Sequence, residues 1–244
     1  RLQSTLGRAP RGVVVGGGLL GLEAAEGLKD LGAEPTILDV APWLLSVEVD
    51  QGGGYAVNAQ IKATGIDIET GVYISGINKD ADGNVVSVSI ADSPSEDAEI
   101  RTLPADMVVF GAGIRPNDEL ARDADLALGE RGGILVNDAC HSSDEHIWAI
   151  GEVACVLGRT WGLVAPANAM ADAVAANLLN DNEEAQVEEF DIATKLKFSG
   201  VQVAGFGDRR GTTEGCLEVL FADPARGMYQ KIVTSGDAKT LLGG

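Results

Sequence analysis

The chain has 244 residues, enough for one large domain or two ordinary ones that each bury a core. Its apolar fraction of 45% and charged fraction of 23% are typical of a globular protein and exclude a disordered or fibrous one. With 37 acidic and 18 basic side chains the net charge is −19, which argues against nucleic acid and membrane surfaces as partners.

The first predicted elements form a strand–turn–helix unit. Residues 12–15 are a glycine followed by three valines and predict a short buried strand. A glycine-rich turn follows at once. From Leu19 to Leu31 apolar residues recur at helical spacing, and Gly32 is placed to end this helix.

The pattern continues as an alternation of strands and helices and then changes. The next predicted elements are a strand at 36–39, a helix at 50–63 and a strand near 66–68. Residues 85–90 then alternate in strand period after a turn at 81–84, which predicts an antiparallel meander. A buried strand at 107–110 closes this unit. Beyond it we expect strands at 134–136 and 147–150 and a helix at 167–179.

The glycine-rich turn, Gly16-Gly17-Gly18-Leu19-Leu20-Gly21, fits the pattern G-x-G-x-x-G between a predicted strand and a predicted helix. In this setting Gly16 allows the tight turn, Gly18 lets the backbone approach a pyrophosphate, and Gly21 permits close helix–strand packing. The free N–H groups at the helix start would offset the diphosphate charge. A turn without a ligand is the alternative, but a bare turn rarely needs three glycines at this spacing.

Two acidic residues follow the turn. Asp39 ends the second predicted strand 18 residues after Gly21, close to the ~20 at which a carboxylate accepts hydrogen bonds from the adenosine ribose. No Lys or Arg lies between Asp39 and Ile61, so NADH is preferred over NADPH. A solvated strand-end carboxylate is the alternative for Asp39. We place Glu23 in the first helical turn, where the helix dipole alone favours a carboxylate.

Three ordered motifs resemble the FAD-dependent pyridine nucleotide-disulfide oxidoreductase superfamily over roughly residues 11–179. They are the stretches 12–25 (GVVVGGGLLGLEAA), 103–117 (LPADMVVFGAGIRPN) and 146–152 (HIWAIGE). The resemblance implies an α/β fold, with a three-layer Rossmann-like NAD-binding domain of parallel sheet plus antiparallel meander, followed by the C-terminal part of an FAD-binding domain. It divides the chain into the NAD-binding domain at 8–113, the FAD-binding part at 114–188, and the start of an interface or C-terminal region at 189–244.

The resemblance also implies roles for individual residues. The stretch from Gly111 to Gly113 would form the crossover between the two cofactor domains. Gly151 and Glu152 match a flavin fingerprint whose acidic residue, more often Asp, binds the ribityl chain. The segment containing Ala165 and Pro166 would bring a helix N-terminus to the flavin, which stabilises negative charge on the reduced ring. Glu23 matches a position that approaches the nicotinamide, so both its structural and its functional roles stay open.

Among subfamilies, five stretches carry a closer resemblance: 16–25 (GGGLLGLEAA), 41–45 (APWLL), 162–166 (GLVAP), 194–203 (TKLKFSGVQV) and 205–208 (GFGD). On these the chain looks most like the large subunit of assimilatory NAD(P)H-nitrite reductase. This resemblance implies electron input from NADH to FAD, with iron–sulfur and sirohaem modules or a small subunit as downstream partners, and it allows a homodimer. No first flavin fingerprint precedes residue 11. We therefore expect a fragment that holds FAD poorly alone. No separate catalytic acid, base or nucleophile is expected, and no role for His141, His146, Ser142 or Ser143.

Two other functions remain open on the sequence. A single-component NADH:ferredoxin or rubredoxin reductase would use the same loop and flavin, and a non-catalytic module could sense NAD through an interaction surface. The three cysteines, Cys140, Cys155 and Cys216, have no C-x-x-C spacing and predict neither a redox dithiol nor a zinc site. With no apolar run of ~18 residues and no signal-peptide pattern, we expect a cytoplasmic protein.

Overall fold

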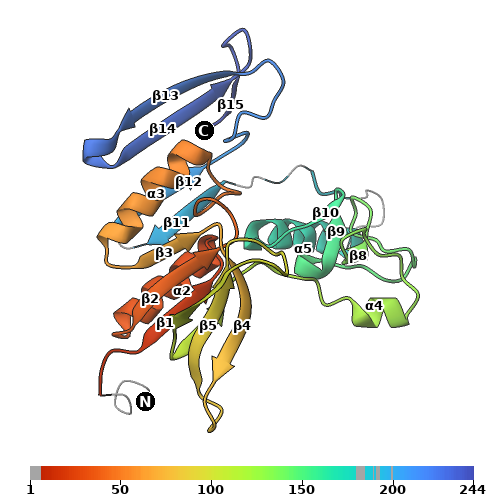
Figure 1. Ribbon diagram of the computed structural model, residues 1–244. Coiled ribbons are helices and arrows are strands. Elements are labelled where there is room, and N and C mark those ends of the chain that lie inside the picture. Colours follow the sequence, from red (N-terminus) through yellow and green to blue (C-terminus); the bar gives the residue numbers. More distant parts are fainter. Residues whose placement is uncertain (1–6, 180–184, 189, 191–192, 199) are drawn as a thin grey trace. The chain divides into compact units, whose positions relative to one another are not determined.

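The structure is a computed structural model that describes residues 7–179, 185–188, 190, 193–198 and 200–244. The chain divides into two compact units (Figure 1). The first combines Arg1–Gly113 with Ala193–Gly244, and the second is Ile114–Ile192. The end of the chain thus belongs to the same unit as its beginning. Most of the acidic stretch before residue 190 lies outside the described residues.

A four-stranded parallel sheet is the centre of the first unit. Its order is β3 (Asp67–Thr70), β2 (Glu34–Asp39), β1 (Arg11–Val15) and β7 (Met107–Phe110), with all pairs parallel. The connecting helices are α2 (Leu19–Asp30) and α3 (Gln51–Ala63). The predicted strands and helices of this unit are confirmed. The side chains of β1 are buried on both faces of the sheet, with Val14 in one core cluster and Val13 in another, which explains its run of valines.

The glycines of α3, which are unfavourable in a helix by propensity, are explained by close packing. A Cβ atom at Gly52 would lie 2.5 Å from the Tyr229 ring, and one at Gly54 would overlap the Trp43 ring. Asp50 caps the helix by accepting a 3.0 Å hydrogen bond from the Gly53 N–H. Tertiary contact and the cap therefore compensate for weak intrinsic helicity.

The predicted meander forms a second layer. β4 (Tyr73–Lys79), β5 (Val85–Ala91) and β6 (Ile100–Pro104) pair antiparallel in the order β4-β5-β6. An apolar core that includes Val13, Leu38, Val88 and Ile90 fills the space between the meander and the parallel sheet. The helices lie on the other side, so the three-layer Rossmann-like arrangement is confirmed.

The last fifty residues add two antiparallel sheets. β11 (Thr194–Phe198) and β12 (Val201–Gly205) form a hairpin. β13 (Leu217–Asp223), β14 (Met228–Thr234) and β15 (Leu241–Gly243) form a three-stranded sheet, in which a 3-10 turn at Pro224–Arg226 connects β13 to β14. Leu196, Phe198 and Val201 of the hairpin lie in the same core cluster as Val14 and Leu22. The helical side of the sheet is thus completed by the end of the chain.

The second unit has a small sheet of β8 (Ile134–Leu135), β9 (Ala154–Val156) and β10 (Arg159–Thr160) beside α5 (Val164–Leu179). It also contains α4 (Glu119–Asp123) and a 3-10 turn, η1 (Gly151–Val153). Among the described helices of both units, none has the length and apolar character that a membrane crossing requires.

The predicted strand at 147–150 is wrong. Only Trp148 makes a single bridge, to His141, and the rest of the segment has no ladder. The backbone groups form local hydrogen bonds instead: the Ile147 N–H donates to the Asp144 carbonyl, and the Ser142 N–H donates to the Ile147 carbonyl. A tight turn therefore takes the place of the predicted strand, although these residues are as apolar as those of a buried strand.

A carboxylate links the neighbouring strands β1 and β7 of the parallel sheet. Asp106, just before β7, accepts hydrogen bonds from the Arg11 N–H at 2.8 Å and from Arg8 at 2.7 and 2.9 Å. Its own N–H donates to the Arg11 carbonyl at 2.8 Å. The hydrogen bonds from Arg8 and then Arg11 hold the pKa of Asp106 well below its usual range. This side chain fixes the register between β1 and β7.

Replacing Asp106 with Asn should lower the free energy of unfolding by about 1–2 kcal/mol at pH 7, because charge-assisted bonds are lost. The folded-state pKa lies below the unfolded value, so this stability is present above about pH 4 and is lost as the pH falls further. Urea denaturation at pH 7 and near pH 3 measures it. The difference in the free energy of unfolding between wild type and variant should become smaller at low pH. The exposed control Glu96→Gln should show no such difference from wild type at pH 7.

Candidate functional site: a dinucleotide loop

Three glycine backbones meet at the carboxyl end of β1. A Cβ atom on Gly16 would lie 2.5 Å from the Gly111 carbonyl oxygen, and one on Gly21 would overlap the Gly16 carbonyl. Gly16 also has a φ of +115°, which disfavours any other residue. The loop, the start of α2 and the end of β7 therefore touch through main-chain atoms. The sequence predicted a tight turn at Gly16 and close helix–strand packing at Gly21, but not that Gly111 belongs to the same cluster.

The position of Gly18 is different. Gly18 is the N-cap of α2, with φ −81° and ψ −177°, and no atom lies within 4 Å of the place that its Cβ would take. No side chain caps the helix, and the first backbone bond there runs from the Leu22 N–H to the Gly18 carbonyl. The N–H groups of Leu19 and Leu20 precede that bond, at the positive end of the helix dipole. The site thus offers donors beside open space.

Asp39 holds the loop from the neighbouring strand. One carboxylate oxygen accepts from the Gly17 N–H, and the other accepts from the Ala41 N–H at 2.7 Å. The side chain is half-buried at the end of β2, where the sequence predicted it. Its backbone contacts were not predicted, because a sequence shows neither the bend after β2 nor its distance from the loop. Each oxygen keeps a lone pair for a further donor.

The segment after β2 supports Gly17 from its other side. The Leu45 N–H donates to the Gly17 carbonyl at 2.8 Å, and a Cβ on Gly17 would lie 2.5 Å from a Leu44 methyl group. Both leucines are buried. Leu45 has a φ of +55°, an uncommon conformation for a side chain of this kind. Sequence reasoning missed this contribution, because a positive φ at a leucine leaves no signal in the sequence.

Two residues named from sequence lie at the edge of this region. Glu23 is exposed and is the fifth residue of α2, so it lies past the first turn, which contains no acidic residue. The expectation that it sits in the first turn is wrong, and the dipole argument for it weakens accordingly. Gly113, after β7, is exposed with a φ of +88°.

In the second unit, the residues that the flavin resemblance named lie on two contacting elements. Gly151 and Glu152 begin η1, and Ala165 and Pro166 are in the first turn of α5. The Gly151 N–H points to the sulfur of Met170, which is fully buried, at 3.3 Å. Gly151 has a φ of +78°, and the neighbouring Glu152 side chain is exposed. Met170 was not predicted as the contact between the elements.

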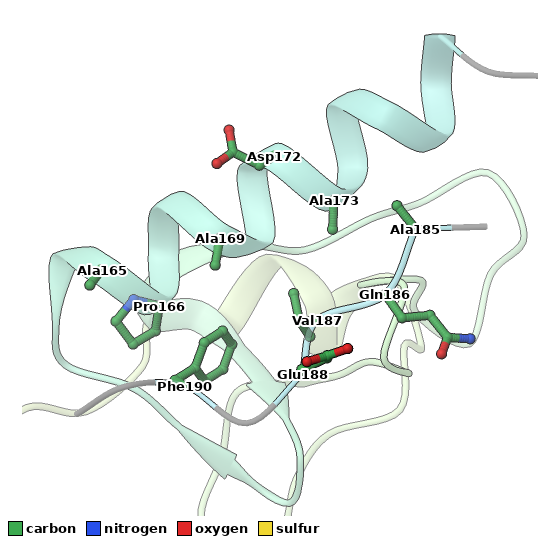
Figure 2. A pocket seen from close by; sticks show the side chains of 10 residues that line it. All are labelled: Ala165, Pro166, Ala169, Asp172, Ala173, Ala185, Gln186, Val187, Glu188 and Phe190. Carbon is green, nitrogen blue, oxygen red and sulfur yellow. The ribbon is translucent and has the colours of Figure 1, made fainter. Parts of the chain in front are cut away.

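A hollow of about 520 Å³ lies along α5 in the second unit. Figure 2 shows Ala165, Pro166 and Ala169 on the helix side, facing Val187 and Phe190 of the returning segment. The Asp172 carboxylate points away from that segment. The lining is largely apolar at the end of the helix that the resemblance assigned to the flavin.

Other reactive side chains form no site among the described residues. No group of three or more His, Cys, Asp and Glu is placed to hold a metal ion there. The thiols of Cys140 and Cys155 are buried, and Cys216 is partly exposed. His141 stacks against Trp148 with ring centroids 4.3 Å apart, while the His146 side chain is exposed.

Comparison with known proteins agrees with this geometry. Residues 1–176 match the model of the family described as pyridine nucleotide-disulphide oxidoreductase. The chain belongs to that family.

The similar curated proteins include nitrite reductases. The chain is 43% identical over 236 residues to the nitrite reductase [NAD(P)H] large subunit of Klebsiella oxytoca, covering 97% of this chain and 24% of that protein. It is 39% identical over 242 residues to the nitrite reductase (NADH) large subunit of Escherichia coli K12, covering 99% and 28%. The chain thus spans about a quarter of the length of these relatives. These findings confirm the resemblance drawn from the motifs.

Solved structures agree on the fold. The ferredoxin reductase of the CYP199A2 system from Rhodopseudomonas palustris is 26% identical, with a TM-score of 0.78, covering 99% of this chain and 57% of that one. An FAD-dependent pyridine nucleotide-disulphide oxidoreductase from Desulfovibrio vulgaris is 25% identical with a TM-score of 0.79, covering 99% and 61%.

Two glycines of α2 give a matched test of the close contact. Gly21→Ala should lower the free energy of unfolding by about 2–3 kcal/mol, because the new methyl group meets the Gly16 carbonyl. Gly27→Ala, on the same helix with open space around it, should raise it by about 0.5–1 kcal/mol. Thermal or urea denaturation measures both. Equal effects of the two changes would contradict the packing described here.

Proposed function

We propose that this chain is the electron-input portion of a nitrite reductase large subunit, which takes hydride from NADH and passes electrons to FAD. The observation that carries the proposal is the cluster of Gly16, Gly21 and Gly111 backbones, which leaves Gly18 and the start of α2 open to a diphosphate. Identities of 43% and 39% to nitrite reductase large subunits support the choice within the family.

The residues present fit a dinucleotide. A phosphate needs hydrogen-bond donors and a main chain that it can approach, and the loop supplies both at Gly18, Leu19 and Leu20. The positive end of α2 also acts locally against the repulsion expected from a net charge of −19. The loop can therefore bind an anion although the whole chain is acidic.

Asp39 favours NADH over NADPH in this proposal. Its carboxylate lies beside Gly17 and keeps acceptor capacity for a ribose hydroxyl. A 2′-phosphate at the same place would meet that negative charge, and the segment between Asp39 and Ile61 carries no Lys or Arg to offset it. Selectivity would then arise from repulsion of the wrong cofactor as well as from attraction of the right one.

The second unit fits one side of a flavin site. FAD, when bound, would accept hydride from NADH and release electrons singly or in pairs. Glu152 would accept a hydrogen bond from the ribityl chain, and its exposure leaves it free to do so. The N-terminal turn of α5, at Ala165 and Pro166, would place its positive end near the flavin ring. Gly111 and Gly113 would connect the two cofactor units, and Glu23 would face the nicotinamide side.

The wider setting is also part of the proposal. Iron–sulfur and sirohaem modules or a small subunit would receive the electrons, and the enzyme would work in nitrate assimilation. Three free thiols among the described residues support a reducing, cytoplasmic location. Association of two copies belongs to the same proposal.

Gly18→Ala tests whether the loop holds the cofactor. The added methyl group meets no protein atom and the backbone angles suit alanine, so the chain should stay folded, at a cost of about 0.5–1 kcal/mol for alanine at an N-cap. A diphosphate over the loop would lose its close approach, and we expect the Kd for NADH to rise about 10-fold or more. Fluorescence titration of the purified chain measures it. Unchanged binding in Gly18→Ala would contradict a cofactor at this loop, and Gly27→Ala is the control.

Asp39→Asn tests whether Asp39 binds the ribose or only supports the loop. The carboxylate charge disappears while the side-chain size is kept. If Asp39 reads the ribose, NADH binding should weaken and NADPH binding should improve, changing the ratio of the two Kd values about 10-fold or more. Titration with both cofactors measures the ratio. A purely structural role would weaken both equally and leave the ratio unchanged.

The other functions that the sequence left open make different predictions. In the complete protein, NADH-dependent reduction of a dye separates an enzyme from a sensor that only binds NADH. Nitrite-dependent oxidation of NADH separates a nitrite reductase from a ferredoxin or rubredoxin reductase. The higher identity to nitrite reductases than to the ferredoxin reductase of known structure favours nitrite.

A further inference from the structure

The segment between β2 and α3 holds Gly17 of the dinucleotide loop by both of its main-chain polar groups. The Asp39 carboxylate accepts a hydrogen bond from the Gly17 N–H, and the Leu45 N–H donates to the Gly17 carbonyl at 2.8 Å. Gly17 directly precedes Gly18, where the proposed function places the diphosphate. The position of this segment therefore determines both the shape of the loop and the place of Asp39.

The same segment makes a tight turn from Leu45 to Val49. The Leu45 carbonyl accepts hydrogen bonds from the N–H groups of Glu48 and Val49, at 2.8 and 2.9 Å. The residue that bonds to Gly17 is thus hydrogen-bonded to the main chain of an acidic residue, Glu48. A displacement of Glu48 would reach the loop through this one turn.

Glu48 is held by two side chains from the last part of the chain. Its Oε2 atom forms an ion pair with Arg209 and accepts a 2.8 Å hydrogen bond from the Thr194 hydroxyl. Arg209 also donates to the Thr194 hydroxyl oxygen, at 2.6 Å, so each of the three side chains bonds to the other two. The Glu48 and Arg209 side chains are 19% and 11% exposed. This pair therefore differs from fully exposed salt bridges, which contribute little.

The hydrogen bonds, more than close packing, fix the position of Glu48. Glu48 and Arg209 line a groove of about 560 Å³ along α3, and residues of β12 and β14 line the groove as well (Figure 1). Arg209 is itself confined, since a Cβ atom on Gly205 would lie 2.9 Å from its Cδ atom. Without Arg209, the Glu48 carboxylate would have room to turn into the groove and regain water.

We propose that Arg209 is a positioning residue for NADH binding, which acts through Glu48 and the turn at Leu45 on Gly17 and Asp39. The inference rests on the proposed function of the dinucleotide loop. A site binds tightly when the groups that touch the ligand are held in place by further contacts. Loss of the ion pair would therefore weaken NADH binding and also make the Asp39 carboxylate less effective in excluding NADPH.

A second buried cation, Lys231, offers a matched comparison. Its side chain is 6% exposed, against 11% for Arg209, and it donates to the Asp50 carboxylate at 3.1 Å. Asp50 also accepts from the Gly53 N–H at 3.0 Å and from the Tyr229 hydroxyl at 2.8 Å. Loss of Lys231 thus leaves two donors on Asp50, so the segment should keep its position.

Titration of the purified chain with NADH and with NADPH tests the proposal. Arg209→Met removes the charge but keeps an unbranched side chain, and it should raise the Kd for NADH about 10-fold and lower the ratio of the NADPH Kd to the NADH Kd. Arg209→Lys keeps the charge and should restore the Kd for NADH to within about 3-fold of wild type. Lys231→Met should change neither Kd by more than about 2-fold. Thermal denaturation gives a temperature at which all variants are folded.

The indole N–H of Trp43 reports on the turn directly, because it donates to the Val49 carbonyl at 3.4 Å. In Arg209→Met its NMR signal should shift, while the indole signals of Trp148 and Trp161, in the second unit, stay unchanged. A Trp43 signal that stays in place would contradict a displaced turn.

Thr194→Val is a milder variant if Arg209→Met does not fold. It keeps the shape of the side chain and removes the hydroxyl shared by Glu48 and Arg209, and it should raise the Kd for NADH about 3-fold. Folded variants that bind NADH as tightly as wild type overturn the proposal, and so does an equal loss of affinity in Lys231→Met. These results leave the proposed function intact if the wild-type chain binds NADH, whereas a wild-type chain without NADH binding overturns both.

Discussion

Main-chain contact between three glycines is the constraint on which the first unit depends. Gly16, Gly21 and Gly111 come from the loop, from α2 and from the end of β7, and a side chain on any of them would push these elements apart. Since α2 must lie close to β1 for its first N–H groups to face the loop, the same contact that packs the fold also shapes the anion site that we propose. In that proposal, packing and binding depend on the same positions.

Much of this could be predicted from the sequence because the signals are local. Local backbone conformation is indicated by the valines of β1, by the spacing of Leu22 and Leu28 in α2, and by the G-x-G-x-x-G loop. The predicted strand at 147–150 was wrong because a short apolar run does not show whether a neighbouring strand exists to pair with it. Asp39 was correctly predicted to lie at the end of β2. Its hydrogen bonds with Gly17 and Ala41 depend on a bend in the chain that no residue type predicts.

The contacts made by the end of the chain were beyond the sequence for another reason. Asp50 and Lys231 lie far apart in sequence, and only the fold brings them together. Burial opposes ionisation of Asp50, but hydrogen bonds from Gly53, Tyr229 and Lys231 lower its pKa overall. The carboxylate that caps α3 thus also attaches the C-terminal sheet. A long-range pair of this kind leaves no periodic pattern to read.

The hairpin of β11 and β12 has a consequence for biosynthesis. Because Leu196 and Phe198 complete the core around Val14 and Ile37, the first 113 residues cannot close their hydrophobic interior when they leave the ribosome. They must wait while the second unit, an insertion of 79 residues between Ile114 and Ile192, is translated. Apolar surface stays open throughout that delay, while the inserted unit can fold first.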